Sequence, residues 1–406
     1  MIHTPTIKKY VGTTIILLTI SLGIIFRLLI FNEEGGDHIT YKTAVLDFCN
    51  GINPYTYTVE SFEDKTLEHG YAYFPTLLYI LSAFWEINVL TQANIPTALM
   101  WKIPVLFADL GVVFLLYKYF KKRDLLAGAF IIAFWFLNPY FTTRYEYCLF
   151  DHIQVFFLFL SLTWLGKKDY LTGVSYALAV SMKTIPGILF SLFLLKSKDW
   201  RKFLLAASAT VVLISAPFLT SKKNISTYVK GALLVHESRS IQGRPILSFI
   251  TYHLQDYGIN FLQTKYTSIY AYAALSIPFL TITYLLIKDR NSNKFKLSAL
   301  GFTLYYLLTP VFNRTHLLWG LPFILITIYE LLKNKKKYFY LGLVSLYIVT
   351  AIYLSVWYKG FETSKNSVNR VYMGNIKNLE GILPLKTKMR NLYYEYRHKY
   401  REILGK

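Results

Sequence analysis

The feature that most constrains this chain is a succession of apolar runs about as long as a membrane is thick. Val11–Phe31, Phe203–Leu219, Tyr266–Ile287 and Tyr338–Trp357 reach or approach the roughly 20 helical residues that cross a hydrocarbon core. No small-residue cleavage site follows the long first run, so we expect it to be a span and not a cleaved signal peptide. With 54% of its 406 residues hydrophobic, the chain is predicted to be an all-α, polytopic membrane protein.

The charge of the chain is strongly positive, with 44 Lys+Arg against 23 Asp+Glu and a formal net charge of +21. The basic residues fall in short clusters between the apolar runs, which is how cytoplasmic loops of membrane proteins are marked. This basicity is therefore interpreted as a topological signal, and nucleic acid is not expected as a partner. The clusters are Lys8-Lys9, Lys118 to Arg123, Lys167-Lys168, Lys196 to Lys202, Lys288 to Lys296 and Lys333 to Lys337.

A first helix that starts inside leaves residues 32–99 outside, and this region carries nine acids and two bases. Its apolar stretch Thr76–Leu90 is short and contains Glu86. If that stretch crossed the membrane, the next span, Trp101–Tyr117, would deliver a basic cluster to the outside. We therefore predict that Thr76–Leu90 lies on the outer surface.

About eleven spans are predicted in all, and they form one domain over residues 1–358 with outer loops at 32–100 and 220–264. Lys183 to Gly187 separate a short pair of spans, where Pro186 and Gly187 can interrupt a helix if its freed backbone groups find partners inside the protein. A basic tail follows over residues 359–406, with an amphipathic pattern near its end, and its side of the membrane is left open. The remaining spans are Leu125–Phe141, Phe150–Leu165, Leu171–Thr184, Ile185–Leu195, Leu297–Phe312 and His316–Leu332.

Polar residues that do not act as topological signals converge on the outer face. Asp37 and Glu34 follow the first span, and the cations and histidines come from later segments. A carboxylate can remove a proton from an attacking hydroxyl, and fixed cations can stabilise a departing phosphate. Such a chamber suits a donor whose phosphate lies at the headgroups while its lipid tail stays in the bilayer. The candidate phosphate or sugar ligands are Arg239, Arg244, Arg314, His316, Lys183 and His152.

The chain resembles the GT-C superfamily of integral-membrane glycosyltransferases over roughly residues 10–330. The order of an Asp after the first span, NGINPY, YAYFP, FADLG, FLNP, FDHIQ, SMKTIPG and RTHLLWGLPF is closest to bacterial and archaeal mannosyltransferases that use polyprenyl-phosphate sugars. The resemblance implies that Asp37 occupies the catalytic acidic position and that the first outer loop contains in-plane helices. Some members carry paired acids there, whereas His38 follows Asp37 here, so a shared role for Glu34 stays open.

The expected function is therefore inverting transfer of a hexose, with mannose expected, from a polyprenyl phosphate to a hydroxyl of a glycan, glycolipid or protein. Asp37 would be the general base at the extracytoplasmic face. No metal-binding spacing stands out, and no cofactor is expected beyond a divalent cation that Asp37 and Glu34 would hold. The alternative function is a transporter or lipid flippase, although the helix break at Pro186 lacks the second, equivalent break common in transporter repeats.

Several residues also keep structural interpretations. Arg27 near the outer end of the first span either snorkels to the headgroups or contacts the donor phosphate. Asp151 begins an apolar helix, so it is either a helix cap or a site residue. The interfacial arginines can bind anionic lipid instead of substrate.

Overall fold

The computed structural model describes residues 4–29, 36–64, 67, 69–138, 150–236, 242–243, 264–313 and 315–361. Within these ranges the fold is all-α apart from one parallel pair of two-residue strands, in which β1 (Gln242–Gly243) lies beside β2 (Val311–Phe312). The amphipathic pattern predicted near the end of the tail lies outside the described residues.

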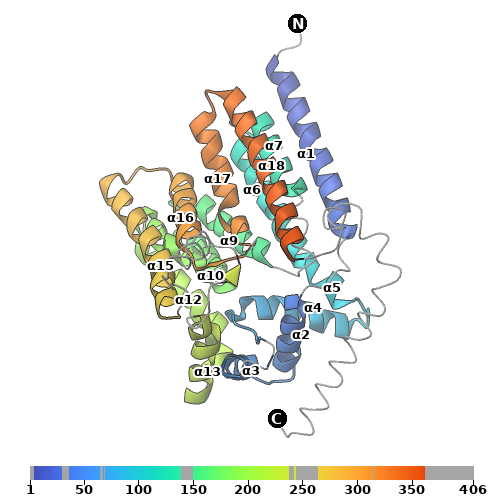
Figure 1. Cartoon of the computed structure of the whole chain (residues 1–406), viewed down its shortest axis with the longest axis vertical. Coiled ribbons are helices and arrows are strands. Elements are labelled where there is room, and N and C mark those ends of the chain that lie inside the picture. Colours follow the sequence, from blue (N-terminus) through green and yellow to red (C-terminus); the bar gives the residue numbers. More distant parts are fainter. Residues whose placement is uncertain are drawn as a thin grey trace.

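A bundle of apolar helices makes up one part of the molecule, and a layer of shorter helices covers one end of it (Figure 1). Neighbouring pairs in the bundle include α1 with α7, α6 with α9, α9 with α10, α10 with α12, and α15 through α17 in sequence. The bundle helices are α1 (Thr4–Leu29), α6 (Lys102–Phe120), α7 (Leu125–Leu137), α9 (Asp151–Trp164), α10 (Asp169–Met182), α11 (Phe190–Lys196), α12 (Trp200–Ser215), α15 (Thr264–Lys288), α16 (Lys294–Leu308), α17 (His316–Leu332) and α18 (Lys336–Phe361).

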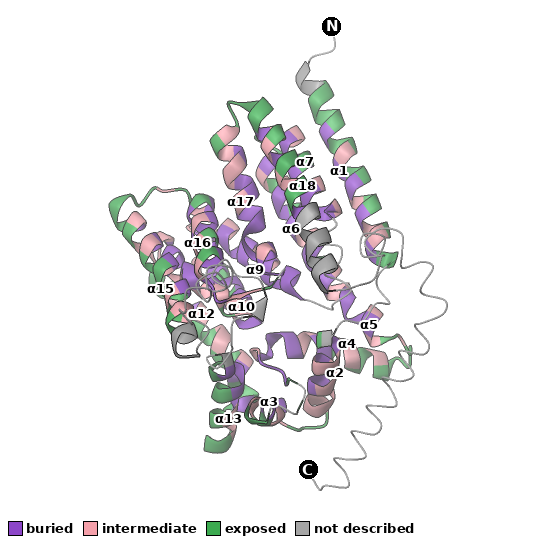
Figure 2. Cartoon of the chain, in the orientation of Figure 1, coloured by how far each residue is buried: buried purple, intermediate pink, exposed green. Residues whose placement is uncertain are grey.

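Four helical segments among the described residues are long and apolar enough to cross a membrane: Ile7–Leu29, Thr97–Phe120, Trp200–Phe218 and Ile269–Lys288. Pro75–Leu90, Leu125–Leu137, Ile185–Lys196 and His316–Leu332 are shorter apolar helices. Many large apolar side chains of α1 and α15 are exposed, and Figure 2 colours much of both helices as exposed. Water would penalise such surfaces and lipid does not, so the fold is that of a multi-pass membrane protein.

Two predicted spans extend too far at their C-terminal ends. The predicted span Leu125–Phe141 becomes α7, which ends at Leu137, and the predicted span Leu297–Phe312 becomes α16, which ends at Leu308. The next residues, Asn138 and Thr309, have extended backbones with ψ of 126° and 135°. Each precedes a proline in the sequence, and the ring of a proline disfavours the helical conformation of the residue before it.

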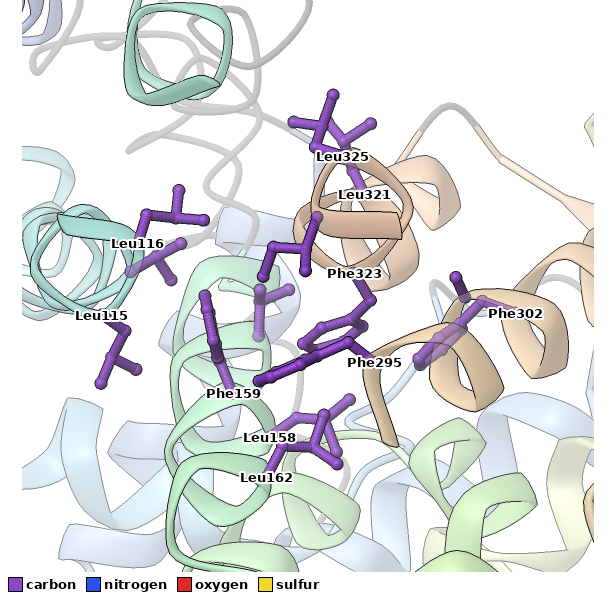
Figure 3. Close-up of a cluster of buried hydrophobic side chains, with 14 of the residues drawn as sticks. Leu115, Leu116, Leu158, Phe159, Leu162, Phe295, Phe302, Leu321, Phe323 and Leu325 are labelled. Carbon is purple, nitrogen blue, oxygen red and sulfur yellow. The ribbon is translucent and has the colours of Figure 1, made fainter. Parts of the chain in front are cut away.

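The bundle core is built from aromatic and leucine side chains of α6, α9, α16 and α17 (Figure 3). Phe323 stacks with Phe295 and Phe302 at centroid distances of 6.4 and 6.1 Å. Phe159 of α9 meets the rings of Phe295 and Phe323 at centroid distances of 5.9 and 5.6 Å, and α9 lies between these rings and α6 (Figure 3). The α9 helix is therefore enclosed by neighbours, which fixes the direction of the side chains at its first turn.

The covering layer consists of α2 (Gly36–Cys49), α3 (Pro54–Glu63), α4 (Pro75–Leu90), α5 (Thr97–Met100) and α13 (Lys222–Ala232), with the turns η2 (Ala216–Phe218) and η3 (Leu234–His236). It has its own core, in which Tyr55 meets Tyr71, Phe218 and Tyr228 at centroid distances of 5.0 to 6.0 Å. The start of α3 is fixed by Asn53, whose side chain accepts a hydrogen bond from the backbone N–H of Tyr55.

The α4 helix lies across the ends of three bundle helices. Thr76 shares a hydrogen bond of 2.6 Å with Ser181 at the end of α10, and the Tyr79 hydroxyl donates to the carbonyl of Ile214 at the end of α12. At the start of α6, Trp101 Nε1 donates to the carbonyl of Leu81 at 3.0 Å. A helix that runs within the bundle would contact the middles of its neighbours, so α4 belongs to the covering layer.

The basic loops gather at the opposite end of the bundle. Lys196 Nζ donates to the carbonyl of Arg290 at 2.9 Å, and Lys294 Nζ donates to that of Leu165 at 3.3 Å. Lys336 forms an ion pair of 2.7 Å with Asp124. In Figure 1 the α15–α16 and α17–α18 turns lie toward the end where α1 begins, far from α2 and α3. The charge asymmetry that predicted the topology is thus a real asymmetry of the fold.

Candidate active site

Asp151 joins three segments of the bundle where it meets the covering layer. Its buried carboxylate forms an ion pair of 2.6 Å with Lys183 through Oδ1. The same oxygen accepts a hydrogen bond of 2.8 Å from Trp319 Nε1 on α17. A buried carboxylate stays charged only where a cation and hydrogen-bond donors replace water. These contacts therefore explain the position of Asp151 without a helix-capping role.

Lys183 reaches Asp151 because α10 ends one residue earlier. Lys183 has extended backbone angles (φ −153°, ψ 139°), and the 3₁₀ turn η1 (Ile185–Leu189) leads into α11. The predicted helix break is confirmed, and one of its freed groups is satisfied internally, since the Tyr176 hydroxyl donates to the carbonyl of Pro186. Lys183 is 19% exposed at its side chain, so it also faces the space outside the ion pair.

Aromatic rings surround this ion pair. Lys183 Nζ lies 5.3 Å from the centre of the Trp319 ring and 5.6 Å from that of Tyr73, within the range of cation–π attraction. His316 stacks on Trp319 at 4.2 Å and interacts electrostatically with Asp151. The structure thus brings together Lys183 and His316, which lie far apart in the sequence, around a carboxylate.

A pocket opens beside this ion pair, with about 230 Å³ of empty space in and before it. Its wall combines rings, apolar side chains, a carboxylate, an amide and an ammonium group. The lining residues are Tyr41, Tyr73, Leu77, Phe150, Asp151, Gln154, Met182 and Lys183.

Asp37 is exposed in the first turn of α2. Tyr41 follows one helical turn later on the same face and lines the pocket. Burial raises the pKa of Tyr41 well above its ordinary value, and nearby Tyr73, Asp37 and Asp151 raise it further. The carboxylate of Asp37 also interacts electrostatically with Lys183. Because Tyr41 lines the pocket, Asp37 lies on the face of α2 that is turned toward it.

His38, the neighbour of Asp37, holds α2 in place. Its Nε2 lies 2.9 Å from the hydroxyl of Thr97, and its ring lies 5.0 Å from that of Trp101. The side chain is buried while that of Asp37 is exposed. The two neighbours in the sequence thus differ in their surroundings, because His38 anchors the helix and Asp37 stays accessible.

His152 is turned away from the pocket. Its fully buried ring meets Trp135 of α7 edge-on, at 5.9 Å between centroids, and it does not line the pocket. Successive helical residues point about 100° apart, so a site that faces Asp151 does not face His152. The sequence could not show this, because α9 is apolar on nearly every side.

Arg27 is neither snorkelling nor open to a donor phosphate. Its fully buried guanidinium forms an ion pair of 2.6 Å with Asp109 of α6 and donates through Nη1 to the carbonyl of Phe136 at 2.7 Å. Asp109 also accepts a hydrogen bond of 2.5 Å from Trp135 Nε1. This pair ties α1, α6 and α7 together and has a structural role.

Four predicted site residues, Glu34, Arg239, Arg244 and Arg314, lie outside the described residues. The described strands β1 and β2 nevertheless bring Gln242–Gly243 beside Val311–Phe312. The ring of Phe312 in turn meets that of His316 at 5.7 Å. Among the residues that the structure describes, no group of three or more His, Cys, Asp or Glu side chains could hold a metal ion.

The fold and the site together define a multi-pass membrane protein with an acid, a cation and aromatic rings around a pocket at one end of its bundle. The model of glycosyltransferase family 87 matches residues 72–310, more than half of the chain, and the chain therefore belongs to this family. It is a GT-C family of membrane mannosyltransferases that depend on polyprenyl-phosphate mannose.

Family membership confirms the predicted resemblance and makes the chain a membrane glycosyltransferase, against the alternative of a transporter without transferase activity. The matched region includes Asp151, Gln154 and Lys183, whereas Asp37 and His316 lie outside it. A comparison with curated proteins finds no match.

Proposed function

We propose that this glycosyltransferase moves mannose, a hexose, from a polyprenyl-phosphate donor to an acceptor hydroxyl. Asp37 is the general base, and the configuration at the anomeric carbon is inverted. The observation that carries the proposal is one pocket wall shared by Lys183 and Tyr41, the residue that follows the exposed Asp37 by one helical turn. A base and a phosphate-binding cation on neighbouring segments are the two groups that such a displacement requires.

In the proposed reaction, the acceptor oxygen attacks the anomeric carbon while Asp37 takes the hydroxyl proton. The bond from that carbon to the phosphate oxygen breaks, and the polyprenyl phosphate departs with the electron pair. Lys183 and His316 stabilise the charge that develops on the phosphate. Asp151 holds Lys183 in position through its 2.6 Å ion pair, so Asp151 is a positioning residue.

The extracytoplasmic location is part of the same proposal. It is supported by the separation between the pocket, which the covering layer closes, and the basic loops at the other end of the bundle. Those loops follow the pattern of cytoplasmic loops. A polyprenyl donor could then keep its tail among the exposed apolar side chains of the bundle while its phosphate reaches Lys183.

The residues outside the described ranges keep their proposed roles. Arg239, Arg244 and Arg314 are proposed phosphate ligands, supported by the pairing of β1 with β2 near His316. Glu34 is proposed to assist Asp37. For His152 we propose an indirect contribution through its contact with Trp135. Residues 1–358 are proposed to form the transferase domain, with the basic tail 359–406 attached to it.

Membranes that contain the full chain test the proposal when they are supplied with radiolabelled polyprenyl-phosphate mannose and, separately, with a labelled nucleotide sugar. Membranes without the chain are the control. We expect label to pass from the polyprenyl donor to membrane glycans, glycolipids or protein only where the chain is present. Transfer from the nucleotide sugar after all polyprenyl phosphate has been removed would contradict the proposed donor.

A further inference from the structure

Gln154 is a buried amide that faces the pocket with no hydrogen-bond partner among the described residues. It lies three residues after Asp151 on α9, so the two side chains share a face of the helix. The side chain of Gln154 is fully buried, and both its Oε1 and its Nε2 lack a partner in the described part of the chain. The second carboxylate oxygen of Asp151, Oδ2, is also buried and also lacks a hydrogen-bond partner among the described residues. Two residues that line the pocket thus carry three buried polar atoms without a partner among the described residues.

Unpaired polar groups inside a protein are costly and rare. Burial of one amide in an apolar setting can be a local imperfection of a fold. Two neighbouring side chains of one helical face that both line a pocket and both carry buried polar atoms without a partner in the described part of the chain are the pattern expected where a ligand supplies the missing partners. The wall is therefore built for a molecule that carries both donors and acceptors.

The chemistry of the wall identifies the class of ligand. An amide both donates and accepts, and a carboxylate oxygen accepts, so adjacent hydroxyl groups satisfy them together. The rings of Tyr41 and Phe150, which meet at 5.1 Å, together with Tyr73, provide apolar surface for the C–H faces of a sugar.

We propose that this pocket is the subsite for the hexosyl ring of the donor and that Gln154 determines which hexose is accepted. The inference rests on the proposed function and names the residue that recognises the sugar. Lys183 lines the same pocket and would hold the phosphate that is attached to the anomeric carbon. The ring against Gln154 is therefore that of the donor and not that of the acceptor. Gln154 and Asp151 Oδ2 then hydrogen-bond to the ring hydroxyls.

Binding to the purified full chain in detergent tests this subsite with three probes: a C10 isoprenyl phosphate, its mannosyl derivative and its glucosyl derivative. The ratio of affinities for the mannosyl and bare compounds isolates the contribution of the ring. In Gln154→Leu we expect this ratio to fall about tenfold, as loss of hydrogen bonds to a buried partner predicts, while affinity for the bare compound stays unchanged. Discrimination between mannosyl and glucosyl compounds should fall with it.

A matched control is Ser191→Ala. Ser191 lies on α11 outside the pocket lining, and its buried hydroxyl, like the amide of Gln154, has no partner among the described residues. The affinity ratios of this variant should equal those of the wild type. Because leucine replaces an unsatisfied amide by an apolar group of similar shape, Gln154→Leu should unfold at or above the wild-type temperature when no ligand is bound.

Three results would overturn the subsite. An unchanged mannosyl-to-bare ratio in Gln154→Leu removes the role of Gln154, and an equal loss of affinity for both compounds shows a structural role. A further measurement adds methyl α-mannoside to protein that already holds the bare isoprenyl phosphate. If Gln154→Leu loses this binding instead, the pocket takes the acceptor ring. Failure of the wild type to bind any of the three isoprenyl probes contradicts the proposed donor itself and, with it, the subsite.

Discussion

Replacement of Asp109 by asparagine should destabilise the fold, because Asp109 neutralises the buried Arg27. The guanidinium reaches Asp109 Oδ2 through Nη2 at 2.6 Å and through Nε at 2.8 Å, and both side chains are fully buried. An asparagine at this position would keep the shape of the side chain and lose its charge. Arg27 would then retain its bonds to the carbonyls of Gly23 and Phe136 and its stacking on the Phe136 ring at 3.7 Å.

The loss follows from the cost of an uncompensated buried charge. Removal of one member of a buried ion pair typically lowers the free energy of unfolding by about 3–5 kcal/mol. The amide of the Asp109→Asn variant can still accept one hydrogen bond from Arg27 or from Trp135, so we expect about 3 kcal/mol, the lower end of that range. Replacement of both charged residues by apolar ones, as in Arg27→Met with Asp109→Leu, should recover most of the loss.

Equilibrium unfolding in mixed micelles, followed by tryptophan fluorescence, measures these free energies for the wild type, Asp109→Asn, Asp109→Leu, Arg27→Met and the double variant Arg27→Met with Asp109→Leu. A coupling near zero in this double-mutant cycle would refute the structural interpretation of the pair. Two results together would instead support Arg27 as a ligand of the donor phosphate. Asp109→Asn would unfold with the wild-type free energy, and Arg27→Met would bind isoprenyl phosphate more weakly.

Two further predictions concern lysines at opposite ends of the bundle. Lys183→Met should lower transfer about a hundredfold, the effect of losing one charge-stabilising donor, whereas Lys183→Arg should keep much of it. A wild-type rate for the methionine variant in the membrane transfer assay would contradict this. At the other end, burial lowers the pKa of Lys294 to about 8, assisted by repulsion from Lys167 and Lys196. The unfolded chain binds this proton up to about pH 10.5, so stability should rise between pH 8 and pH 10.5. Lys294→Met should lose that rise in thermal unfolding at stepped pH, and an unchanged pH profile would refute the assignment.

Much of the architecture was predictable because it follows from local rules. The short length of Thr76–Leu90, its Glu86 and the position of the next basic cluster indicated a surface helix, and α4 (Pro75–Leu90) lies across the helix ends. The Pro186–Gly187 step and the charge before it indicated a break that the structure has at Lys183. Charge placement and backbone chemistry act over a few residues, so a sequence displays them.

The partners of buried charges were not predictable, because they come from distant positions. Arg27 and Asp109 lie 82 residues apart, and Asp151 and Trp319 lie 168 apart. An Asp in the first turn of a helix can be a helix cap or an ion-pair partner until the facing helix is known. Gln154 appeared only as the last residue of the FDHIQ motif, and nothing marked it as a ligand, since α9 is buried on almost all sides.

The central claim, that Asp37 is the base beside the Asp151–Lys183 pocket, is tested most directly by transfer from polyprenyl-phosphate mannose with Asp37→Asn. Asp47→Asn on the same helix α2 is the matched control. General-base catalysis is worth roughly 10²–10⁴-fold, so we expect a loss in that range for Asp37→Asn, wild-type rates for Asp47→Asn, and unchanged binding of isoprenyl phosphate in both. Transfer by Asp37→Asn at the wild-type rate would contradict the account.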